Sequence, residues 1–122
     1  MRNIFRIVAL GVTMVSSVAA LAETGNNEQL LRKALQAVAQ GQCPADIMSP
    51  MLRGSCMQGM PGFGQTVASL GAIGKADYMG TQQTPMGPAE VYRVIFANGS
   101  MMWMINTGPD GKAIVFWSPG PQ

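Results

Sequence analysis

The chain of 122 residues contains no histidine. Serine and cysteine triads, histidine general bases and most zinc sites use an imidazole as base or ligand, so their absence is expected. The sequence also lacks a Walker loop, a dinucleotide-binding fingerprint and a calcium loop. Its acidic residues, such as Asp46 and Asp110, are too scattered to indicate a carboxylate pair. We therefore predict no catalytic residue, no cofactor and no metal site from motifs.

The first 22 residues have the organisation of an export signal. Arg2 and Arg6 form a short basic region, an apolar run covers residues 7–18, and residues 20–22 (Ala-Leu-Ala) make a small-x-small cleavage site. An uncleaved anchor is the alternative, but a spanning helix needs roughly 20 apolar residues and this run is shorter. We predict that residues 1–22 are a signal peptide and that the mature protein is periplasmic or secreted, with no stable membrane anchor.

Charge is scarce, because only 11% of residues are charged. The chain has eight basic and six acidic residues, and two of the basic ones lie in the predicted signal. A mature protein with balanced charges offers no electrostatic footprint for nucleic acid or an anionic membrane. We expect neither of them as a partner.

The mature chain has two cysteines, Cys43 and Cys56. A disulfide persists in the oxidising compartment to which the signal points. A redox or nucleophilic thiol is the functional alternative, but the spacing is not Cys-x-x-Cys. We predict a structural disulfide between Cys43 and Cys56.

Residues 23–122 are predicted to form one domain with a core over about 28–118. Apolar residues at helical spacing predict an amphipathic helix over residues 28–40. A short helix over residues 51–58 is expected next, behind a first-turn proline. Pro61 and Gly62 should end it, and residues 63–70 are expected to form one or two further turns.

The pattern indicates a strand over residues 72–82, with Ile73 and Met79 on one side and Tyr78 on the other. A turn-rich loop over residues 84–88 should follow it.

Residues 91–117 predict a three-stranded antiparallel meander. Asn98-Gly99 is a strong hairpin signal, because a type I′ turn needs positive φ at both central residues. Residues 108–111 (Gly-Pro-Asp-Gly) predict a type I turn with the last glycine in the left-handed position. The first turn would place Phe96 opposite Met101.

This register gives the sheet two faces, both largely apolar. The first face should pack on the helices and comprises Tyr92, Val94, Phe96, Met101, Trp103, Ile105, Val115 and Trp117. The second face supplies the candidate interface residues Val91, Arg93, Ile95, Met102, Met104, Ile114 and Phe116. A face exposed to water should alternate with polar residues, so something is expected to cover the second face. Its one charge, Arg93, is an anion anchor in a pocket, the polar element of a protein contact, or an arginine whose stem lies on apolar neighbours with its head in water.

The segment VYRVIFANGSMMWMINTGPDGK resembles the sheet signature of small exported bacterial domains of the cystatin-like and nuclear-transport-factor-two-like superfold, in a family of unknown function. The resemblance implies an α+β fold in which N-terminal helices pack on a curved antiparallel sheet of three to four strands. Members of the superfold include isomerase-like enzymes, small-ligand binders and dimerisation modules, so it implies architecture rather than activity. The isomerase-like members suggest Asp77 and Tyr78 as an acid/base site.

Methionine is unusually abundant, with 11 in the chain. Met48 and Met51, and Met57 and Met60, are spaced i, i+3, and residues 101–104 contain three more. Thioethers in an exported protein suit Cu(I), whereas the structural alternative is that methionine fills irregular cores and adaptable interfaces.

Three functions therefore compete. The first is a non-enzymatic exported binding or interaction module whose second face forms a homodimer or docks a protein partner. The alternative is a pocket for a small apolar ligand, with isomerase-like activity as one form of it, between helices and sheet near Tyr92 and Trp103. The third is Cu(I) binding by methionine.

Overall fold

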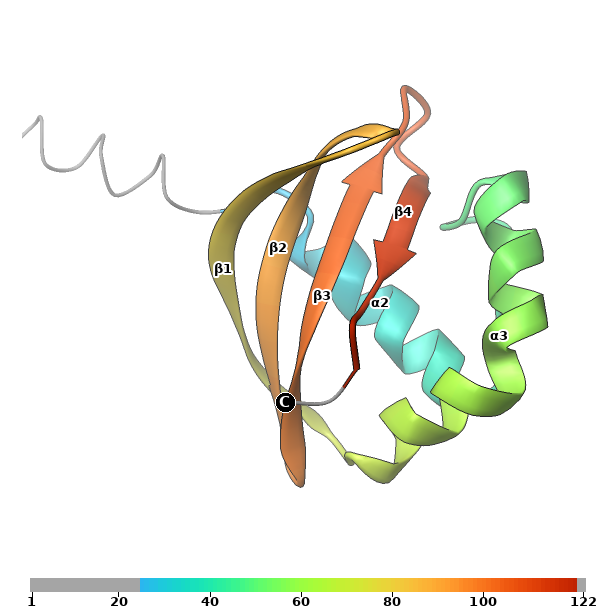
Figure 1. The fold of residues 1–122 in the computed structure, drawn as a ribbon. Helices are drawn as coiled ribbons and strands as arrows, with labels where there is room; N and C mark the ends of the chain where they lie inside the picture. The colour runs from blue at the N-terminus through green and yellow to red at the C-terminus, as the bar shows by residue number, and fades with distance from the viewer. Residues whose placement is uncertain (1–24, 121–122) are drawn as a thin grey trace, which may run out of the picture.

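The computed structural model describes residues 25–120, which form two helices followed by a four-stranded antiparallel sheet (Figure 1). The helices are α2 (Glu28–Ala39) and α3 (Pro50–Ser69). The strands are β1 (Ile73–Thr84), β2 (Gly87–Phe96), β3 (Gly99–Thr107) and β4 (Ala113–Trp117), in the order β1-β2-β3-β4. The predicted α+β fold, with helices preceding a meander, is confirmed. The predicted signal peptide lies outside the described residues.

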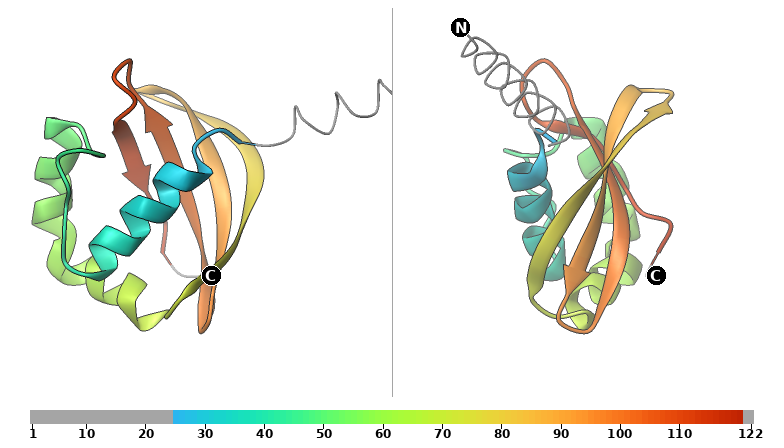
Figure 2. Two further views of the ribbon diagram at one scale, coloured as in Figure 1. Left: turned by 180° about the vertical axis from the view of Figure 1, so that it is seen from behind. Right: turned by 90° about the vertical axis from the view of Figure 1, so that its left-hand side faces the viewer.

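The helices take different positions around the sheet. Figure 1 views the sheet from the face that neither helix crosses, and Figure 2 shows α2 lying across the opposite face. Helix α3 runs beyond the β4 edge and contacts both α2 and β4. The second face is therefore left without a helix among residues 25–120.

The core lies between α2 and the first face of the sheet. The apolar stripe of α2 is fully buried and consists of Leu31, Ala34, Leu35 and Val38. The first-face residues of β2 and β3 are buried against it, as predicted: Tyr92, Val94, Phe96, Met101, Trp103 and Ile105. Helix α2 is marginal by length, so this buried stripe is what holds it in place.

Helix α3 is continuous through Pro61, and the predicted break at Pro61 and Gly62 is wrong. It begins as predicted, with the Ser49 hydroxyl accepting a hydrogen bond from the Leu52 N–H at 3.2 Å. An internal proline removes one helical hydrogen bond and bends the helix, and Figure 1 shows α3 changing direction along its length. Buried residues on both sides of the bend, Cys56 and Val67 among them, anchor the two halves separately.

Strand β1 is confirmed, but its sides differ from the prediction. Register shifts between Ile73 and Ala76 and between Tyr78 and Gly80 interrupt its alternation. Tyr78 consequently lies opposite Tyr92 and packs on the core, as Ile73 also does. Bulges of this kind reverse the sidedness of the residues that follow them. The predicted loop over residues 84–88 shrinks to two residues, because Thr84 already pairs with Gly87.

The hairpin between β2 and β3 turns one residue earlier than predicted. Phe96 pairs with Gly99, and Val94 rather than Phe96 lies opposite Met101. The N–H groups of the loop residues Ala97 and Asn98 donate to carbonyl oxygens at the α3–β1 connection, at 2.9 and 2.8 Å. These tertiary hydrogen bonds fix the loop. The register moves by two residues, so every side chain keeps its predicted face.

The turn before β4 is confirmed. The Gly111 N–H donates to the Gly108 carbonyl at 3.0 Å, Gly111 has φ +81°, and the Gly108 N–H donates to the Lys112 carbonyl. Beyond the turn, however, Thr107 pairs with Ala113 while Asn106 pairs with Val115. One extra residue, Ile114, is thus inserted into β4.

This bulge exchanges the faces of the rest of β4. Phe116 lies opposite Ile105, faces the core and is 9% exposed, whereas Trp117 lies opposite Met104 and is 54% exposed. The predicted placement of Phe116 on the second face, and of Val115 and Trp117 on the first, is wrong. The cause lies outside the sheet. Ala113 donates its N–H to Ile47 and accepts from Ser49, at 2.8 and 2.9 Å, so the start of β4 is held by a neighbouring loop.

Candidate functional site

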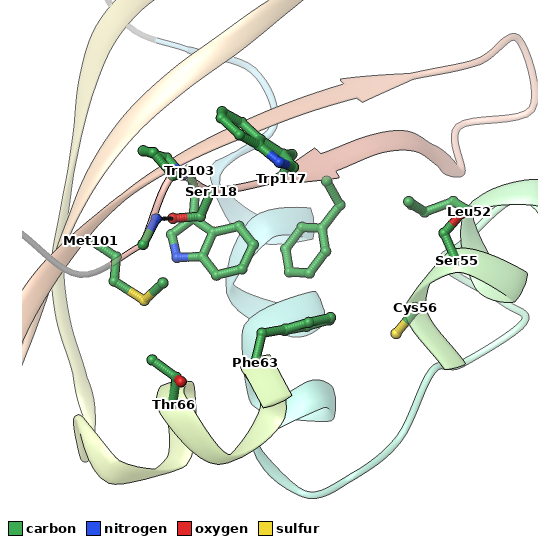
Figure 3. A pocket seen from close by; sticks show the side chains of 12 residues that line it. Leu52, Ser55, Cys56, Phe63, Thr66, Met101, Trp103, Trp117 and Ser118 are labelled. Carbon is green, nitrogen blue, oxygen red and sulfur yellow. Dashed lines mark hydrogen bonds between the residues drawn. The ribbon is translucent and has the colours of Figure 1, made fainter. Parts of the chain in front are cut away.

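A cavity of about 370 Å³ lies between α3, the sheet and the C-terminal segment (Figure 3). Helix α3 contributes Leu52 and Phe63, strand β3 contributes Trp103, and strand β4 contributes Phe116 and Trp117. Its lining is mainly apolar, and no charged side chain of residues 25–120 takes part in it. The cavity therefore suits an uncharged guest.

Three aromatic rings form a fixed cluster in the cavity wall. Trp103 and Phe116 are stacked, with ring centroids 4.4 Å apart and planes inclined by 20°. Phe63 meets both of them edge-on, at centroid distances of 6.4 and 6.5 Å. Offset-stacked and edge-on rings are favourable arrangements, so these side chains give the cavity a preformed surface.

The indole nitrogen of Trp103 is a buried polar atom in this wall. The side chain is 2% exposed, and its Nε1–H is buried with no hydrogen-bond acceptor among the described residues. The indole nitrogen is a donor only, and a buried donor without a partner costs about 1–3 kcal/mol. No other buried side-chain nitrogen or oxygen within residues 25–120 is left in this condition.

The segment Ser118–Gly120 forms another wall of the cavity. The Gly120 N–H donates to the Ser118 hydroxyl at 3.0 Å, as the dashed line in Figure 3 shows. The β ladder ends at Trp117, which pairs with Met104. This wall is therefore held less firmly than the walls made by α3 and β3.

Only one of the two predicted pocket residues lies in the cavity wall. Trp103 lines the cavity, whereas Tyr92 does not. Tyr92 is buried in the core beside Tyr78, with ring centroids 5.6 Å apart. Sequence reasoning missed Phe63, which it placed in a separate turn, and Phe116, which it assigned to the other face. Pro61 signals either a break or a bend before Phe63 and does not distinguish them, and no local signal reveals the bulge before Phe116.

Glu90 is a further residue that the sequence did not single out. Its carboxylate accepts hydrogen bonds from the N–H groups of Asn26 and Asn27, at 2.8 and 2.9 Å, and from the Tyr92 hydroxyl at 2.6 Å. A Cβ added at Gly25 would overlap the Tyr92 hydroxyl, so the chain passes close to it. Glu90 thereby fixes the start of the described chain to the sheet, just before α2.

Burial raises the pKa of Tyr92 far above its ordinary value of 10.0, and the hydrogen bond to Glu90 raises it further. The folded state then holds the hydroxyl proton more tightly than the unfolded state. The stability from this group is complete below about pH 10 and is lost as pH rises above it, by at most about 1.4 kcal/mol per pH unit.

We expect Tyr92→Phe to remove part of the stability loss between about pH 9 and about pH 11, because phenylalanine does not titrate. Urea unfolding at the two pH values measures the difference, and Tyr78→Phe serves as the matched control. The expectation fails if Tyr92→Phe loses as much stability as the wild type over this range.

The predicted interface residues of β2 and β3 lie on the second face, whereas Ile114 is the inserted residue of the bulge and Phe116 faces the core. Five of them are half-buried: Val91, Ile95, Met102, Met104 and Ile114. Arg93 is exposed and lies opposite Asp77 and Met102. Trp117 joins this face in place of Phe116. That a second copy or another protein covers the face stays a prediction.

The suggested acid/base pair is not assembled. Tyr78 faces the core opposite Tyr92, whereas Asp77 pairs with Arg93 across the sheet and contacts Lys75 at 3.4 Å. Adjacent strand residues point to opposite faces, so these two side chains do not share a site.

The methionines are spread over different environments. Met48 is buried while Met51 is 76% exposed, which separates the first predicted pair. Met57 and Met60 share a shallow hollow with Arg53, whose positive charge disfavours a cation there. Cu(I) binding stays a prediction that this arrangement does not favour.

The Cys43–Cys56 disulfide is confirmed, with Cα atoms 6.1 Å apart. Within residues 25–120 no helix is both long and apolar enough to span a membrane. The likeness to the cystatin-like superfold stays a prediction. Comparison with known proteins finds no family model, curated protein or solved structure that matches this chain.

Proposed function

We propose that the chain is an exported, non-enzymatic binding module that takes up a small apolar molecule in the cavity between α3 and the sheet. The observation that carries the proposal is the cavity itself, with its volume of about 370 Å³ and its cluster of packed aromatic rings. Ligand sites of about 300–1,000 Å³ with mainly apolar walls are typical of proteins that bind small molecules.

The lining favours binding over catalysis. Its polar side chains are the hydroxyls of Ser55, Thr66 and Ser118 and the indole of Trp103. None of these titrates near neutral pH, and general acid–base chemistry needs a group that does. The Thr66 hydroxyl donates to the Gly62 carbonyl at 3.2 Å, so it already has a structural partner.

The compartment proposed for this function is the periplasm or the cell exterior. The disulfide supports it, because such bonds persist in oxidising compartments. The signal-like first 22 residues support it from the sequence.

Filling the cavity tests the proposal. We expect the wild type to bind N-phenyl-1-naphthylamine, a neutral apolar probe whose fluorescence rises in apolar surroundings. Thr66→Phe places a ring in the cavity and should weaken binding on the order of tenfold or more, because guest and side chain compete for one volume. A fluorescence titration measures both affinities.

The matched control is Gln58→Phe, which adds the same ring to an exposed position of α3 outside the cavity lining. It should bind the probe as the wild type does. Equal weakening in both variants, or no probe binding by the wild type, would contradict the proposed site.

A further inference from the structure

The buried indole N–H of Trp103 bears on what kind of molecule the cavity accepts. Trp103 lines the cavity, and its Nε1 lacks an acceptor within the described chain. Native proteins pair nearly all buried polar groups, so a donor left over in a cavity wall calls for an acceptor from outside residues 25–120.

The nearby hydroxyls do not supply that acceptor. The hydroxyls of Ser55, Thr66 and Ser118 line the same cavity, but none of them forms a hydrogen bond with Trp103. Among the described residues the donor is thus left for a guest.

The charge of the guest follows from the same walls. No charged side chain of residues 25–120 lines the cavity. A bound anion would therefore lose its hydration without gaining a cationic partner, and a bound cation would lose its hydration without gaining a carboxylate. Burying an unpaired charge is far more costly than burying a neutral carbonyl that gains a hydrogen bond. The guest is therefore neutral.

We infer that the ligand is a neutral, mainly apolar molecule whose one essential polar group is an oxygen acceptor of the ketone or amide class, bound to Trp103 Nε1. This inference rests on the proposed function and specifies its ligand class. Phe63 and Phe116 offer ring surface for the apolar body, and Trp103 fixes its orientation.

Ser118–Gly120 is the wall of the cavity with the fewest hydrogen bonds among the described residues. These residues line the cavity, and within the described chain their only hydrogen bond is the internal one between Gly120 and Ser118. The other walls belong to α3 and to the hydrogen-bonded strands β3 and β4. The C-terminal segment is the wall that costs least to move.

Two probes with one carbon skeleton test the inference: tetralin, a hydrocarbon, and 1-tetralone, its ketone. The protein has two tryptophans, so a ¹H–¹⁵N spectrum shows two indole N–H resonances, which Trp117→Phe assigns. We expect 1-tetralone to move the Trp103 resonance downfield, as hydrogen bonding does, and tetralin to lack this downfield shift.

Trp103→Phe provides the energetic readout. It keeps an aromatic ring and removes the donor. The ratio of 1-tetralone affinity to tetralin affinity should fall about two- to tenfold in this variant, the range expected for one neutral hydrogen bond. Comparing ratios cancels effects that the substitution has on both probes.

The outcomes separate the two proposals. Equal ratios in wild type and variant, with no downfield shift of the Trp103 resonance by 1-tetralone, would overturn the ketone or amide class while tetralin binding left the apolar site standing. Failure of both probes to bind would overturn the site itself. The spectrum of the wild type decides the matter even if Trp103→Phe does not fold.

Discussion

Replacing Phe116 by alanine will lower the free energy of unfolding by about 3–5 kcal/mol, the usual cost of truncating a buried aromatic side chain. Phe116 is 9% exposed, stacks on Trp103 and meets Phe63 edge-on. Truncation removes its buried area and both ring contacts. It also enlarges a cavity that already exists, which limits how far the surroundings can relax to fill the space.

The neighbouring substitution Trp117→Ala is the matched control, and it should cost less than about 1 kcal/mol, because exposed positions contribute little. Trp117 is 54% exposed on the second face. Urea unfolding followed by circular dichroism measures both variants without depending on tryptophan fluorescence. Without the bulge at Ile114, the two side chains would change places and so would the two costs. A larger loss for Trp117→Ala than for Phe116→Ala would therefore refute the register of β4.

The bulge in β4 also shows which side-chain faces could not be predicted from the sequence. Alternation placed Tyr92, Val94 and Trp103 on one buried face, and this prediction survived a wrong hairpin register because the error was two residues. In β4 the same method failed, because one inserted residue reverses the parity of all that follow. Its cause is a pair of hydrogen bonds between Ala113 and a loop more than 60 residues earlier in the chain, one donated and one accepted by Ala113, which no local pattern reveals.

The candidate site was predictable only in part for the same reason. Trp103 could be placed on the wall of a pocket from alternation alone. Phe63 needed the knowledge that α3 continues through Pro61, where the burial of residues on both sides outweighs one lost hydrogen bond. Glu90 pairs with backbone N–H groups about 64 residues away, at Asn26 and Asn27. Contacts of this kind depend on the assembled fold.

Reducing the Cys43–Cys56 disulfide will lower the free energy of unfolding by about 3 kcal/mol, because an unfolded chain without the cross-link regains loop entropy. The cysteines are 13 residues apart, and a domain of this size has roughly 5–15 kcal/mol of net stability. Urea unfolding with and without dithiothreitol measures the loss. The double variant Cys43→Ala, Cys56→Ala is the control, since it should be equally stable under both conditions. Identical unfolding midpoints of the wild type in both conditions would contradict the expectation.

The stability lost on reduction should differ between the two halves of α3, because Pro61 divides the helix into halves that are anchored differently. Gly64 and Val67 are buried in the second half, whereas Cys56 is the buried residue of the first. Arg53 adds one hydrogen bond from its Nε to the Cys43 carbonyl at 2.7 Å. Reduction should therefore speed hydrogen exchange more before Pro61 than after it. Uniform exchange along α3 would show that its halves are held together by something other than the disulfide.

Leu52 and Cys56 line the cavity from the first half of α3, so the reduced protein should also bind the naphthylamine probe more weakly.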